Sequence, residues 1–259
     1  MRQAIIADIH EWYRADGVNW NWASENLDAI GIRACQGMNM DELFPEHVER
    51  ADSHGLNYFT YAVLTHLAPP DEAVDYYLEL DGVSGHPVCG DVEPADGGMI
   101  TEYHGRRFFQ LCDLKSNSET WYYSNYNSSK KIGFPKWSKD RFCFWAEYPY
   151  DIVTKYRSID RYLQKNPWKI PKWAARTGYT PDIHQFTDYG KAQGTIANQY
   201  TSHPVYKHGI KGADFSVSLM DADELKLLFN HHIEKPSVLQ RIELLESQVS
   251  VLGRFHGIE

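Results

Sequence analysis

The feature that most constrains the fold is an alternation of short apolar runs with amphipathic helical stretches along most of the chain. Runs of strand length end at Gly, Pro or acidic residues, and the segments after several of them carry apolar residues at helical spacing. This order is typical of βα units joined into a parallel sheet. The predicted strands cover residues 3–9, 31–35, 56–64, 86–92, 120–124, 141–148 (or 139–148), 181–186 and 213–217.

The predicted helices cover residues 41–54, 70–80 and 100–114, with a weaker helical pattern at residues 21–30. Residues 149–180 contain several Pro and Trp residues and are expected to form long loops. About eight strands in about 220 residues favour closure into a barrel over an open sheet. A chain of 259 residues suits one domain of this size. We therefore predict an α/β fold of the TIM-barrel type.

A separate segment is expected after the barrel, because the pattern breaks near Pro236. We assign residues 1–232 to the catalytic barrel domain and residues 233–259 to a C-terminal helical extension. An apolar heptad stripe with alternating spacings of four and three runs through this extension at Val238, Ile242, Leu245, Val249 and Leu252. Such a stripe either packs on its own barrel or pairs with a second copy. We expect a weak homo-oligomer through residues 237–255, with a complete barrel in each monomer.

Composition and charge exclude several classes of protein. The formal net charge is −9, whereas proteins that bind nucleic acid through its phosphates are usually basic. No run reaches the ~18 apolar residues of a membrane helix. Asp8 and Glu11 interrupt the first apolar run, which is therefore not a secretory signal. The 4 cysteines form no CxxC pair. We expect synthesis in the cytoplasm without a signal peptide, no nucleic-acid partner and no membrane insertion.

The strongest local signal for chemistry is a pair of acids, Asp91 and Glu93, at the carboxyl end of a predicted strand. Alternation along a strand places both on one face, ~6.5–7 Å apart at a rise of ~3.3 Å per residue. Two carboxylates this close repel, so one of them holds a proton more tightly. A protonated acid beside a carboxylate is the pairing that glycoside cleavage needs. Asp8 and Asp214 end the first strand and begin the last, so closure of a barrel would bring four carboxylates to one mouth.

Further motifs occur in order between about residues 5 and 220. Their residues are Asp8, residues 32–37 (I-R-A-C-Q-G), Asp41, Phe44, Ala51, Gly55, Asp91, Glu93, Ala146, Tyr148, Gln185, Phe186, Thr187, Gly190, Gly209, Gly212 and Asp214. This series resembles the motifs of the family 25 glycoside hydrolases, the lysozymes (N-acetylmuramidases) of bacteria and many phages. The chain departs from the family pattern at His10, at residues 61–63, at His184 and at Ser216, and it carries an insertion of about 18 residues after Gly190.

The resemblance implies a modified barrel of eight strands and about five helices, and an enzyme of the phage endolysin type. Its implied reaction is cleavage of the β-1,4 bond between N-acetylmuramic acid and N-acetylglucosamine in peptidoglycan, without a cofactor. It implies that Glu93 is the general acid, that Asp91 stabilises the charged intermediate, and that Asp8 and Asp214 hold the sugar and tune the pair. The residues expected to contact sugar are Tyr61, Tyr123, Tyr148 and Gln185. Such an enzyme would reach the wall after holin-type release or as part of a phage particle.

Three other interpretations remain open from the sequence. Chitinase-like barrels usually carry D-x-D-x-E, but Cys89 occupies the position of their first acid. A metal-dependent hydrolase could use Asp8 and His10 with the acid pair, although no His-x-His or His-Glu-x-x-His motif supports it. We therefore expect no bound metal. The third alternative is a catalytically inactive wall-binding or structural module of a phage particle.

Overall fold

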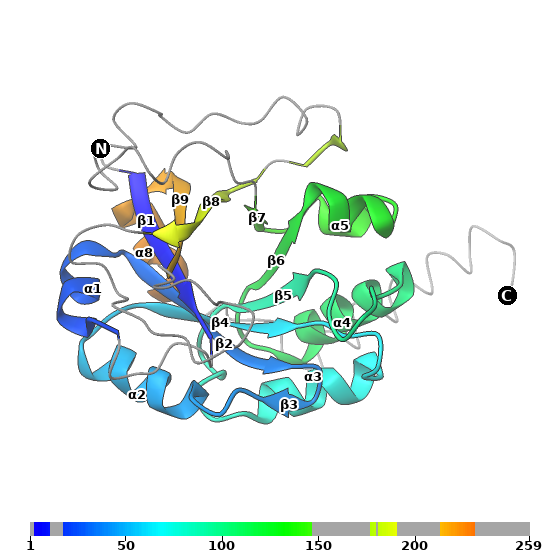
Figure 1. The fold of residues 1–259 in the computed structure, drawn as a ribbon, viewed down its shortest axis with the longest axis horizontal. Coiled ribbons are helices and arrows are strands. Elements are labelled where there is room, and N and C mark those ends of the chain that lie inside the picture. Colours follow the sequence, from blue (N-terminus) through cyan, green and yellow to red (C-terminus); the bar gives the residue numbers. More distant parts are fainter. Residues whose placement is uncertain (1–2, 11–17, 147–176, 180, 191–212, 231–259) are drawn as a thin grey trace, which may run out of the picture.

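A computed structural model describes residues 3–10, 18–146, 177–179, 181–190 and 213–230 (Figure 1). Within these ranges the chain forms a closed α/β barrel, which confirms the predicted fold class. The barrel strands are β1 (Gln3–Ile9), β2 (Ala29–Gln36), β4 (Tyr58–Val63), β5 (Val88–Val92), β6 (Thr120–Asn125), β7 (Cys143–Ala146), β8 (Ile183–Gly190) and β9 (Ala213–Asp221). A short β3 (Asn39–Met40) pairs with β2 outside the ring.

Closure joins the first strand to both the second and the last, as predicted. β1 runs parallel to β2 and antiparallel to β9. The other neighbours from β2 to β8 are parallel, but β9 is antiparallel to both β8 and β1. The alternating pattern of βα units did not predict this reversal. A strand that follows its neighbour in the antiparallel direction needs no helical crossover, so no helix signal marks the step from β8 to β9.

The described helices lie outside the ring or at its end. They are α1 (Trp20–Asn26), α2 (Phe44–Ser53), α3 (Pro70–Glu79), α4 (Glu102–Lys115), α5 (Tyr126–Lys131) and α8 (Ala222–Asn230), with a 3₁₀ turn η2 (Lys136–Ser138). α5 and α8 were not predicted. α5 has only six residues and no apolar period. α8 is marked by a capping box, in which Asp221 accepts from the backbone of Glu224 and the Glu224 carboxylate accepts from the backbone of Asp221.

Two apolar clusters separate the inside of the barrel from its outer layer. The inner cluster comprises Ala4, Ile6, Ala29, Phe59, Cys89, Trp121, Phe144, Ile183 and Leu225. Phe59 and Phe144 come from strands that are not neighbours, and their ring centroids lie 5.9 Å apart across the interior. The outer cluster packs the helices α1–α4 against the other strand face. The barrel is therefore filled by side chains rather than hollow.

The direction of β9 decides which end of the barrel is closed. β9 ends beside Gln3, at the amino ends of the parallel strands, so α8 begins there. Leu225 of α8 belongs to the inner cluster, and the Phe229 ring lies 5.9 Å from Trp121. α8 thus covers the amino end, and the carboxyl ends are left as the mouth.

Several predictions fall partly or wholly outside the described residues. The loops expected at residues 149–180 are described only at residues 177–179, and the helix expected at residues 237–255 is not described. The cysteines at 35, 89, 112 and 143 are all buried, and none of them forms a disulfide bond. No helix among the described residues is long and apolar enough to cross a membrane.

Candidate active site

A cavity of about 170 Å³ opens at the carboxyl ends of the parallel strands. Strands β1, β2, β4, β5, β6, β7 and β9 contribute to its wall. The lining residues are Asp8, His10, Arg33, Phe59, Tyr61, Val63, Cys89, Asp91, Glu93, Tyr123, Phe144 and Asp214. The structure therefore places all four carboxylates named from the sequence on one cavity.

Strand register explains why residues so far apart in the chain meet here. Asp8 pairs directly with Asp214 across the β1–β9 ladder. Asp91 lies opposite Val63 on β4 and opposite Tyr123 on β6. Side chains directly opposite on neighbouring strands point to the same face, so these residues form one ring inside the mouth.

Asp91 is the most isolated of the four acids. Its side chain is 8% exposed, and its Oδ1 atom is buried without a hydrogen-bond partner. Burial raises the pKa of Asp91 well above its usual range, and the charges of Glu93 and Asp8 raise it further. The Arg33 guanidinium opposes this rise. In its ionised form, Asp91 would interact strongly with a positive charge in the cavity, because its Oδ1 atom has no hydrogen-bond partner to offset its charge.

Glu93 follows β5 directly and is less deeply buried than Asp91. Asn125, at the end of β6, donates a hydrogen bond from Nδ2 to the Glu93 Oε1 atom. Burial raises the pKa of the Glu93 carboxyl, and the hydrogen bond from Asn125 opposes that rise. A carboxyl group with a raised pKa at the rim of a cavity is suited to hold and deliver a proton.

Asp8 is held by polar groups on two sides. The Gln185 Nε2 atom donates to Asp8 Oδ2 over 2.7 Å, and a side-chain hydrogen bond joins Asp8 to Asp214. Burial raises the pKa of Asp8 to about 7, the two hydrogen bonds oppose the rise, and the charge of Glu93 adds to it. Asp8 therefore holds its proton to a higher pH than an ordinary aspartate.

Two of the four residues expected to contact sugar are found on the wall of the cavity. Tyr61 and Tyr123 line the cavity. The Tyr61 hydroxyl donates to the Ile9 carbonyl over 3.3 Å, and the Tyr123 hydroxyl donates to Gln185 Oε1 over 2.8 Å. Gln185 is 1% exposed and uses both ends of its amide to link Tyr123 to Asp8. Tyr148 lies outside the described residues.

Two polar residues of the site were not singled out from the sequence. Arg33 lines the cavity, and its Nε atom donates to both carboxylate oxygens of Asp41, over 2.9 and 2.7 Å. The helix predicted from Asp41 begins only at Phe44, so the prediction was wrong at Asp41. Asn125 occupies the residue after a predicted strand, as Glu93 does. This shared position, directly after a predicted strand, was the sequence signal that could have identified Asn125 as a residue of the site.

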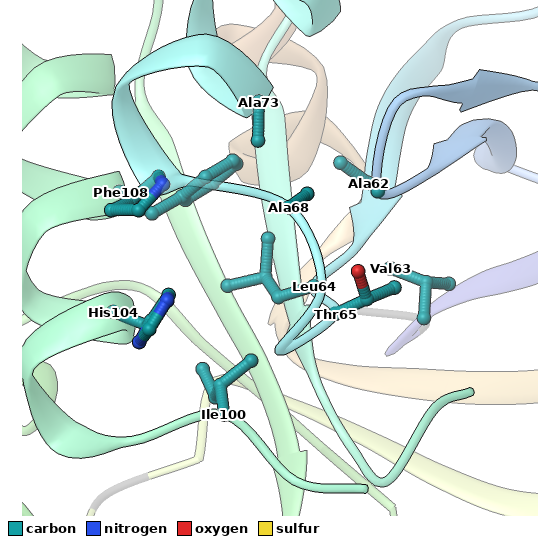
Figure 2. A pocket seen from close by; sticks show the side chains of 11 residues that line it. Ala62, Val63, Leu64, Thr65, Ala68, Ala73, Ile100, His104 and Phe108 are labelled. Carbon is teal, nitrogen blue, oxygen red and sulfur yellow. The ribbon is translucent and has the colours of Figure 1, made fainter. Parts of the chain in front are cut away.

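A second, smaller cavity offers less chemistry. It is lined mostly by apolar side chains, including Ala62, Leu64, Ala73 and Phe108, with His104 at one side (Figure 2). Its volume is about 10 Å³. This volume suits at most one water molecule. No group of three or more His, Cys, Asp or Glu side chains in the described part of the chain has the arrangement of a metal site.

Comparison with solved structures identifies the architecture. A glycosyl hydrolase 25 of Streptococcus pneumoniae matches with a TM-score of 0.61 at 15% identity, over 90% of this chain and 94% of that one. The catalytic domain of an endolysin from bacteriophage P40 of Listeria monocytogenes matches with a TM-score of 0.60 at 16% identity, over 89% and 98%. The chain has the fold of the family 25 glycoside hydrolases.

The same fold occurs in a lysozyme from Streptomyces coelicolor, which matches with a TM-score of 0.63 at 13% identity, over 89% of this chain and 98% of that one. No protein-family model and no curated protein sequence matches the chain. The family 25 fold is thus evident from the three-dimensional arrangement, at sequence identities too low to carry a function on their own.

Proposed function

We propose that this chain is a peptidoglycan hydrolase that cleaves the β-1,4 bond between N-acetylmuramic acid and N-acetylglucosamine. The observation that carries the proposal is the convergence of Asp8, Asp91, Glu93 and Asp214 on one cavity at the mouth of a family 25 barrel. Structures with this fold include proteins described as lysozymes and as a phage endolysin. Retention of all four acids argues against an inactive wall-binding module.

Glu93 acts as the general acid in this proposal. It lies at the rim, and its raised pKa keeps the carboxyl protonated at a higher pH than usual. Asp91 lies deeper, where burial and the charge of Glu93 raise its pKa well above the usual range and the Arg33 guanidinium opposes that rise. Because Asp91 and Glu93 repel each other when both are charged, ionisation of Asp91 favours a proton on Glu93. Glu93 then protonates the leaving oxygen.

Asp91 stabilises the positive charge that forms on the sugar, by orienting the N-acetyl group of the substrate. Its unpartnered Oδ1 atom supports this role, because that atom has no hydrogen bond to give up. Asp8 and Asp214 hold the sugar and set the charge of the cavity. Tyr61, Tyr123 and Tyr148 contact sugar rings, whereas Gln185 acts through its hydrogen bond to Asp8. No cofactor or metal takes part.

The same proposal includes the place where the enzyme acts. The resemblance to a phage endolysin domain supports action on the bacterial wall after holin-type release, or as part of a phage particle.

Digestion of purified peptidoglycan tests the proposed function. We expect loss of turbidity and new reducing ends at N-acetylmuramic acid, with none produced by Glu93→Gln. New reducing ends at N-acetylglucosamine would assign a different glycosidic bond. Binding to the wall without any release would favour the non-catalytic alternative and overturn the proposal.

A further inference from the structure

Asn125 links the end of β6 to two different partners. Its Oδ1 atom accepts a hydrogen bond from the Ser128 backbone N–H over 2.8 Å, which caps the amino end of α5. Its Nδ2 atom donates to Glu93 Oε1. One amide side chain therefore connects the start of a helix to the proposed catalytic acid.

The cap fixes the direction in which the amide points. A backbone N–H can only donate, so the oxygen of Asn125 must face Ser128 and its NH₂ group must face Glu93. Rotation of the amide by 180° would place two donors against each other at Ser128. The Glu93 Oε1 atom is therefore always offered a donor, and it must accept.

The backbone around Asn125 is itself held firmly. The Ser124 hydroxyl donates to the Val92 carbonyl over 2.9 Å, which ties β6 to the end of β5 next to Glu93. The Ser129 hydroxyl of α5 donates to Ser124 Oγ over 3.0 Å. Ser124 and Ser129 are both 0% exposed. The position of the Asn125 amide relative to Glu93 is thus set by buried hydrogen bonds on both sides.

We propose that Asn125 is a positioning residue that holds Glu93 Oε1 as an acceptor and so favours Oε2 as the site of the transferable proton. The inference rests on the proposed function. When Glu93 carries a proton, Oε2 is the favoured site, because the carbonyl oxygen of a carboxyl group is a better acceptor than its hydroxyl oxygen and Oε1 is the atom that accepts from Asn125. The acid therefore presents its O–H mainly in one direction. After transfer the carboxylate keeps the same hydrogen bond, so Asn125 also stabilises the charged product form.

The hydrogen bond has a second effect, on the pH range of the acid. Because it favours the ionised form of Glu93, its removal raises the pKa of that group. Activity that requires protonated Glu93 then persists to higher pH, so the alkaline limb of the pH–rate profile moves upward. The other titratable or charged groups on the same cavity, which stay unchanged in the variants below, are Asp8, His10, Arg33, Tyr61, Cys89, Asp91, Tyr123 and Asp214.

Three substitutions of Asn125 separate the effect of capping α5 from the effect of the hydrogen bond to Glu93. Asn125→Ser keeps a capping oxygen but is too short to reach Glu93, and Asn125→Asp keeps the cap and places an oxygen where the donor was. Asn125→Ala loses both interactions. Thr101→Ala is the matched control, because Thr101 caps α4 through the His104 N–H, and Thr101 does not line the cavity.

We expect kcat to fall by about 10-fold to 100-fold in Asn125→Ser, the usual effect of a hydrogen bond to a charged group. The alkaline limb of its pH–rate profile should move to higher pH, and its Tm should be nearly unchanged. Asn125→Asp should move the limb further, because a second carboxylate faces Glu93. Thr101→Ala should lower Tm and leave kcat unchanged. Wild-type kcat and an unmoved limb in both Asn125→Ser and Asn125→Asp would overturn the proposal, as would a loss of kcat that follows only the loss of Tm.

A measurement without substrate distinguishes this inference from the proposed function. Carboxyl ¹³C NMR follows the titration of Glu93 directly, with Glu93→Gln used to assign its signal. We expect the Glu93 titration to move to higher pH in Asn125→Ser. An unchanged titration would overturn the role of Asn125 even in an active enzyme. A shifted titration in a protein that cleaves no peptidoglycan would instead reject the proposed function.

Discussion

The two ends of the barrel interior are built from the same strands but have opposite chemistry. At the closed end, Trp121, Phe59 and Phe144 pack together under α8, with ring centroids 4.9 Å apart for Phe59 and Trp121. At the open end, the four carboxylates line the cavity. The two environments are only two residues apart along one strand face. On β6, for example, Trp121 belongs to the apolar closed end, whereas Tyr123 lines the cavity.

The difference shows how stability and chemistry are divided within one fold. The closed end removes large aromatic surfaces from water, which stabilises the native state. The open end buries carboxyl groups, which opposes folding whenever they are ionised. We therefore expect substitutions at the open end to change the rate of reaction and the pH dependence of stability, and substitutions at the closed end to change the free energy of unfolding at every pH.

The largest effect is expected from Glu93→Gln at the open end. Loss of the general acid should lower kcat by at least about 10²-fold, while the fold is kept because Gln offers Asn125 the same acceptor. Turbidity loss on purified peptidoglycan and thermal unfolding measure the two quantities. The exposed Glu49→Gln on α2 serves as the control. Near-wild-type lysis by a folded Glu93→Gln protein would remove Glu93 from the role of acid.

The largest effect on stability is expected from Trp121→Ala at the closed end. Trp121 is 0% exposed and contacts Phe59, Phe142 and Phe229. Truncation should lower the free energy of unfolding by about 3–5 kcal/mol, measured by denaturant titration. Leu227→Ala, at a position 57% exposed on α8, should cost far less. Equal losses in the two variants would contradict the packing of the closed end.

An intermediate effect is expected from Asp8→Asn, and it depends on pH. Folding raises the pKa of Asp8 from 3.8 to about 7, so the native state binds this proton more tightly than the unfolded state. The resulting stabilisation is complete below about pH 3.8 and is lost as the pH rises through about 7. The loss is on the order of 4 kcal/mol, at about 1.4 kcal/mol for each pKa unit.

Asn stays neutral, so Asp8→Asn should be more stable than the wild type above pH 7, with a gain that disappears below pH 4. Thermal unfolding from pH 3.5 to 8.5 measures this, with the exposed Asp81→Asn as the control. A stability difference that does not change with pH would contradict the prediction.

The smallest effect is expected from removal of metal ions. Carboxylates that act on a proton and a sugar need no divalent ion, so dialysis against EDTA should leave the rate of wall hydrolysis unchanged. Full loss of activity that one divalent ion restores would favour the metallohydrolase interpretation, with Asp8 and His10 among its ligands.

Strand alternation in the sequence was enough to predict the position of the acids. Asp91 and Glu93 share one face of a strand, and closure of the barrel brings Asp8 beside Asp214. The sequence pattern could not predict the partners of these acids. The contact of Asn125 with Glu93 depends on the register of β5 against β6, and local periodicity carries no information about register. The same holds for Gln185, which lies 177 positions from Asp8.

The pairing of β1 with β9 has a consequence for the order of folding during synthesis. β9 is the last barrel strand to leave the ribosome, so until then one edge of β1 and one edge of β8 have no neighbour. Ring closure joins segments that are distant in sequence, a topology that folds slowly and leaves sheet edges open to association with other chains. Asp214 arrives with that last strand, so the four-acid cavity forms only when the ring closes, and a nascent chain that lacks β9 has no complete site.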